Sequence, residues 1–71
     1  MLFAKLLRSA GRTWQCSVEL DDLGWSVREE TDDRVLIKTH YHDWHRVERT
    51  MALFDLKAVA LERQGWTEVL V

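Results

Sequence analysis

Residues 43–65 read DWHRVERTMALFDLKAVALERQG, and this stretch decides the fold. Apolar side chains recur along it at steps of three, four, three, four and three, at Trp44, Val47, Met51, Phe54, Ala58 and Leu61. That spacing is one continuous stripe along an α-helix. Asp43 can cap the first turn, Arg63 suits the negative helix end, and Gly65 can end the helix. We predict a helix over residues 44–64, which would be about 31 Å long.

The residues before this helix follow a different period. Over residues 13–20 apolar and polar side chains alternate, which is typical of a strand with one buried face. Further runs begin at Trp25 and Arg34, after turns at residues 21–24 and 32–33. In the last run, Val35, Ile37 and Thr39 should share one face. We therefore predict a three-stranded antiparallel meander over residues 13–41.

The two ends of the chain complete the predicted architecture. Residues 1–11 place Leu2, Phe3, Leu6, Leu7 and Ala10 on one helical side, which predicts a short N-terminal helix that Gly11 ends. Residues 66–71 predict a final strand, beside either the third or the first strand of the meander. The expected fold is one α+β domain over residues 1–71, with a meander and a C-terminal strand packed on one long helix.

Composition narrows the classes of function. The chain has 71 residues, a net charge of −2 and a single cysteine, Cys16, which excludes an intramolecular disulfide. A reducing, cytoplasmic setting is expected. No apolar run approaches the roughly 20 residues that span a bilayer, so no membrane role is expected. Residues 1–12 hold three basic residues and no acid, which could indicate a surface-seeking or targeting segment, although a basic helix on an acidic domain is favoured.

A cluster of histidines lies where the meander meets the long helix. His40 and His42 would project from one strand face, and His45 lies in the first helical turn, so the three could bind zinc or nickel with Asp43 nearby. Residues 39–45 also resemble the metal-binding turn of metallo-β-lactamase-type hydrolases. In that family, however, the aspartate falls one position later than Asp43, and the resemblance covers seven residues, so we assign no hydrolase role. Adventitious metal binding is favoured over a biological site.

The long helix carries a second apolar stripe, at Leu53, Leu56 and Ala60, opposite the first. A helix that packs on one sheet needs only one such stripe, so something should cover the other. Two candidates stay open: the N-terminal helix, or a second protein chain, which includes a homodimer. Of the four tryptophans, Trp66 is the one that could anchor a partner, because the other three suit the core.

No catalytic motif is present: each of the three glycines is explained by a turn or a helix end, and Cys16 lies on an apolar strand face as an inert thiol. The α-β-β-β-α order resembles double-stranded-RNA-binding domains in outline, but the long helix begins with Asp43 and Glu48 instead of lysines. We therefore expect a small non-catalytic module that binds a protein partner. The alternatives are a metal-binding protein and, less favoured by the charge, a nucleic-acid binder using Arg28, Lys38 and Arg46.

Overall fold

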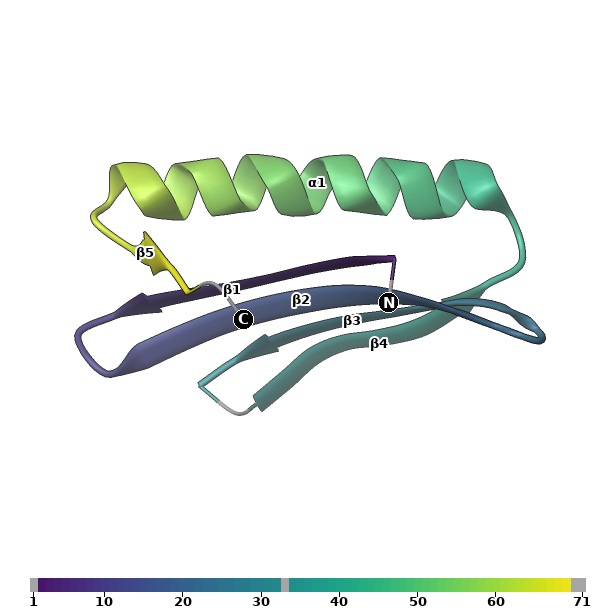
Figure 1. Cartoon of the computed structure of the whole chain (residues 1–71), viewed down its shortest axis with the longest axis horizontal. Coiled ribbons are helices and arrows are strands. Elements are labelled where there is room, and N and C mark those ends of the chain that lie inside the picture. Colours follow the sequence, from purple (N-terminus) through teal and green to yellow (C-terminus); the bar gives the residue numbers. More distant parts are fainter. Residues whose placement is uncertain (1, 33, 70–71) are drawn as a thin grey trace.

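The computed structural model describes residues 2–32 and 34–69. This part of the chain forms a five-stranded antiparallel sheet with one helix packed across one face (Figure 1). The elements are β1 (Phe3–Ser9), β2 (Arg12–Asp21), β3 (Gly24–Thr31), β4 (Arg34–Tyr41), α1 (Trp44–Arg63) and β5 (Thr67–Glu68). Their order across the sheet is β4-β3-β2-β1-β5. The face under α1 is called the helix face below, and the opposite face is called the open face.

The predicted long helix is confirmed. The Asp43 carboxylate accepts a hydrogen bond from the backbone N–H of His45 at 2.9 Å, which caps α1 as expected. At the other end Gly65 has a φ of +100°, and its N–H donates to the Glu62 carbonyl at 3.0 Å. Val47, Phe54 and Ala58 of the first stripe are buried against the sheet.

The N-terminal segment is a strand, so the prediction of a short helix over residues 1–11 is wrong. Residues Phe3 to Ser9 pair with β2, from Phe3 opposite Val18 to Ser9 opposite Arg12. Ala10 and Gly11 both have positive φ, which is the geometry of a tight two-residue hairpin turn. The apolar residues suit a helix and a strand alike, and a short terminal helix is unstable alone, whereas pairing with β2 satisfies the backbone.

The predicted meander is confirmed as β2, β3 and β4, with one local correction. The register between β3 and β4 shifts between Glu29 and Glu30, so Ile37 lies opposite Glu29 while Val35 lies opposite Glu30. Leu36 is therefore the extra residue of a β-bulge. Because residues directly opposite share a face, Val35 lies on the open face and not with Ile37 as predicted.

The C-terminal strand pairs with β1, which is neither of the two predicted neighbours. Glu68 lies opposite Leu7 and Thr67 opposite Arg8, and the Val69 N–H donates to the Leu6 carbonyl at 2.8 Å. The first strand of the meander, β2, cannot pair with β5, because β3 lies on one side of it and β1 on the other. Residues 70 and 71 of the predicted strand lie outside the described residues.

The core lies between α1 and the helix face of the sheet, and it includes one carboxylate. Its buried apolar residues are Leu7, Trp14, Cys16, Val18, Val27, Val47, Phe54 and Ala58. Glu29 of β3 is only 4% exposed among them. Its carboxylate accepts hydrogen bonds from the Trp14 indole N–H, at 2.7 Å, and from the Lys57 ammonium of α1. This charged contact joins the helix to the sheet.

Candidate functional site

The second stripe of α1 is exposed. Leu53 and Leu56 are 59% and 68% exposed, and Ala60 is exposed as well. The N-terminal segment cannot cover them, because it is strand β1 and packs under the inner side of the helix (Figure 1). This finding removes the N-terminal segment from the two covers considered for the stripe. We call Leu53, Leu56, Val59 and Ala60 the outer patch of α1.

Val59 was missed by the sequence reasoning. It is 44% exposed and lies three residues after Leu56, so it extends the outer patch by one side chain. The step of three from Leu56 was the signal for it, but Val59 also lies toward the flank of the helix. Only its exposure in the folded structure separates it from the core stripe.

Arginines lie at both ends of the outer patch. Arg49 precedes Leu53 by four residues, and Arg63 follows Ala60 by three, so each neighbours the patch on the helix surface. Asp55 is turned to the flank, where its carboxylate lies 3.5 Å from the Lys5 ammonium of β1. The outer patch is therefore an apolar centre with a cation at each end.

Trp66, the other predicted partner-binding residue, is not part of this surface. It follows the end of α1, packs against the core and is partly buried. The guanidinium of Arg12 lies 5.6 Å from the centre of its ring, a cation–π contact that covers it. Its role in the structure is to hold the chain where it turns from α1 to β5.

The three histidines do not converge. The rings of His40 and His42 lie edge to face with centres 5.0 Å apart, and His45 is exposed in the first turn of α1. His40 is directed instead to Asp21, with its Nε2 atom 3.1 Å from the carboxylate. Within residues 2–32 and 34–69, no three His, Cys, Asp or Glu side chains are grouped to hold a metal ion. The geometry that the metal-binding alternative requires is therefore not formed.

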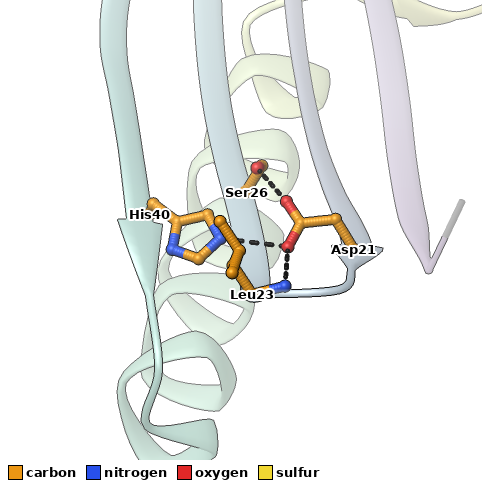
Figure 2. A network of polar contacts seen from close by, with 4 residues as sticks. All are labelled: Asp21, Leu23, Ser26 and His40. Carbon is orange, nitrogen blue, oxygen red and sulfur yellow. Dashed lines mark hydrogen bonds and ion pairs between the residues drawn. The ribbon is translucent and has the colours of Figure 1, made fainter.

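Asp21 is the centre of a polar network at the β2–β3 turn (Figure 2). Its carboxylate accepts hydrogen bonds from the Leu23 backbone N–H at 2.8 Å and the Ser26 hydroxyl at 3.1 Å, besides its contact with His40. The hydrogen bond from His40, followed by that from Leu23, lowers the pKa of Asp21 below its ordinary value. The network ties the turn to β4, which is a structural role.

The three basic residues of the nucleic-acid alternative are divided between the two faces of the sheet. Arg28 and Lys38 lie opposite each other on β3 and β4, on the open face, whereas Arg46 belongs to α1 on the other face. The open face carries a groove of about 1170 Å³ whose lining includes both cations and also Glu19 and Glu30. The structure does not join the three into one cationic surface.

The lone thiol is buried. Cys16 is 3% exposed on the helix face of β2, and desolvation by this burial raises its pKa to about 12. A thiol with that pKa is protonated at neutral pH and a poor nucleophile. The position agrees with the prediction of a core residue.

No helix in the described part of the chain is both long enough and apolar enough to cross a membrane. No family model matches the chain, and no curated protein or solved structure is a match for it.

Proposed function

We propose that this protein is a non-catalytic module that binds another protein through the outer patch of α1. The observation that supports the proposal is the exposure of Leu53, Leu56 and Val59 on the side of the helix that faces away from the sheet. Contiguous apolar surface of this kind is typical of an interaction site, and an amphipathic helix face is a common docking surface.

The charges around the patch favour a different protein over a second copy. If two α1 helices packed antiparallel about a two-fold axis at Leu56, residues seven positions before and after it would face each other. Arg49 and Arg63 would then be opposed, which is unfavourable for like charges. A partner with carboxylates about 21 Å apart, the length of 14 helical residues, would instead pair with both.

The size of the patch indicates modest affinity. Burying the exposed parts of Leu53, Leu56 and Val59 would contribute about 3–5 kcal/mol in all. A micromolar complex requires about 8 kcal/mol. The partner must therefore add contacts with the arginines or the flanks of α1 to reach a dissociation constant of about 1 µM.

The test compares Leu56→Glu with Leu20→Glu. Leu20 is 66% exposed at the end of β2 and does not belong to the outer patch, so the second variant makes the same change at a similar exposure. Both variants should fold like the wild type by circular dichroism, because neither side chain is in the core. Proteins captured from the native host by wild type and Leu20→Glu, but lost with Leu56→Glu, are candidate partners.

Each candidate is then purified and its binding measured by calorimetry. We expect Leu56→Glu to weaken binding by at least about tenfold and Arg49→Glu to weaken it less. Leu20→Glu should bind like the wild type. Equal capture by both variants, or unfolding of Leu56→Glu, would show that the outer patch is not a docking surface.

A further inference from the structure

The edge of the sheet at β4 is a second exposed surface, remote from the outer patch. β4 is the last strand of the sheet, so one of its sides pairs with β3 and the other meets no strand in the described part of the chain (Figure 1). Its side chains Val35, Leu36 and Ile37 are 46%, 48% and 38% exposed. A long edge strand with exposed apolar residues is a template for a further strand.

The charges on this edge are all of one sign. Arg34 and Lys38 lie on either side of the apolar residues, and β4 contains no acidic residue. Among the described residues, no carboxylate forms an ion pair with Arg34 or Lys38. Lys38 lies directly opposite Arg28, but the guanidinium of Arg28 is ion-paired with Glu30. Among the described residues Lys38 has no such acidic partner, and an acidic group beside it would supply one.

We propose that an extended acidic peptide segment binds along β4 as a sixth strand of the sheet. The register of β4 with β3 is uninterrupted from Ile37 to Tyr41, which gives a regular five-residue edge. Along it Lys38 is on the open face, while Ile37, opposite the buried Glu29, is on the helix face. The bound segment therefore alternates, with acidic side chains beside Lys38 and apolar side chains beside Ile37.

A second copy of the chain fits this edge poorly. Pairing β4 with β4 of another molecule would bring together Arg34 and Lys38 from each strand, with no acid on either. Edge cations of this kind oppose self-pairing. The surface is also independent of the outer patch, because β4 is an edge strand of the sheet, whereas the outer patch belongs to α1, which lies in a separate layer (Figure 1).

The probe is a fluorescent peptide of seven residues that alternates glutamate and valine. A lysine–valine peptide of the same pattern and a glutamate–valine peptide with the same composition in two blocks serve as controls. By fluorescence anisotropy, the wild type should bind the alternating acidic peptide at least about tenfold more tightly than either control, and less tightly as salt is added. Hydrogen exchange should show new protection at β4 amides and none in α1.

Substitutions at Lys38 test whether this residue recognises the acidic side chains of the peptide. Lys38→Glu should bind the lysine peptide in place of the acidic one, and Lys38→Gln should weaken binding of the acidic peptide. Arg8→Glu makes the same charge change at an exposed position of β1, near the opposite edge, and should bind like the wild type. Leu56→Glu should also bind like the wild type, which separates this site from the outer patch.

Four results would overturn the proposal. One is equal binding of the acidic and basic peptides. The second is acidic-peptide binding that Lys38→Glu leaves unchanged. The third is acidic-peptide binding that Leu56→Glu abolishes. The last is dimerisation of the free protein in sedimentation, with protection of β4 amides before any peptide is added.

Discussion

The ion pair between Lys57 and the buried Glu29 should contribute measurably to stability, and Lys57→Met tests this. Methionine keeps the unbranched length and the helix propensity of lysine but removes the charge. Glu29 is 4% exposed, and its carboxylate would keep only the Trp14 indole as a donor. Removing one partner of a buried ion pair costs about 3–5 kcal/mol.

The expected loss is smaller here, because the Lys57 side chain is itself 47% exposed and its charge is partly solvated. We expect Lys57→Met to lower the free energy of unfolding by about 2 kcal/mol. The total free energy of unfolding of a chain of this length is about 4–10 kcal/mol. The midpoint of thermal unfolding should therefore fall by about 8–16 °C.

The assay is urea unfolding followed by tryptophan fluorescence, with Lys5→Met as the matched control. Lys5 also joins the sheet to α1, but its partner Asp55 is 57% exposed. The control should therefore lose at most about 1 kcal/mol. In a Glu29→Gln background no buried charge is left unpaired, so Lys57→Met should then cost less than about 0.5 kcal/mol. The reasoning fails if Lys57→Met lowers the free energy of unfolding of the wild type by less than about 0.5 kcal/mol. It also fails if the loss is the same in the wild type and in the Glu29→Gln background.

Three further predictions concern the β2–β3 turn and the buried thiol. Gly24→Ala should lower the free energy of unfolding by about 2–3 kcal/mol in the same assay, because Gly24 has a φ of +136° and an added Cβ would collide with the Tyr41 carbonyl oxygen; an unchanged urea midpoint would contradict this. The lowered pKa of Asp21 in the folded state gives stability that is fully present above its unfolded pKa of about 4 and is lost as the pH falls through the folded value. The wild type should therefore be more stable than Asp21→Asn at pH 6, with a gap that narrows in urea titrations from pH 5 towards pH 2; a constant gap would refute the assignment. Cys16 should react with a thiol reagent at pH 8 only as fast as the protein unfolds, in step with urea concentration, and rapid labelling of the native protein would show that the thiol is accessible.

The sequence by itself determined the elements whose signals are local. The cap at Asp43, the apolar stripe and Gly65 specify α1 within one stretch, because helical hydrogen bonds join residues four apart. The alternation over residues 13–20 specifies β2 in the same way. The exposed stripe at Leu53, Leu56 and Ala60 could also be predicted, since it is the remainder of the same helix after one face is assigned to the core.

The tertiary structure alone decided features that depend on distant partners. Residues 3–9 suit a helix and a strand equally, and only the free side of β2 makes them β1. The bulge at Leu36 and the position of β5 depend on the register and on the free edges of the finished sheet. Glu29 follows the apolar alternation of Trp25 and Val27 in sequence, yet a buried carboxylate there requires Lys57, 28 residues away, which no local pattern indicates. Strand pairing and burial are decided by contacts between segments far apart in the chain, whereas the helix is decided by its near neighbours.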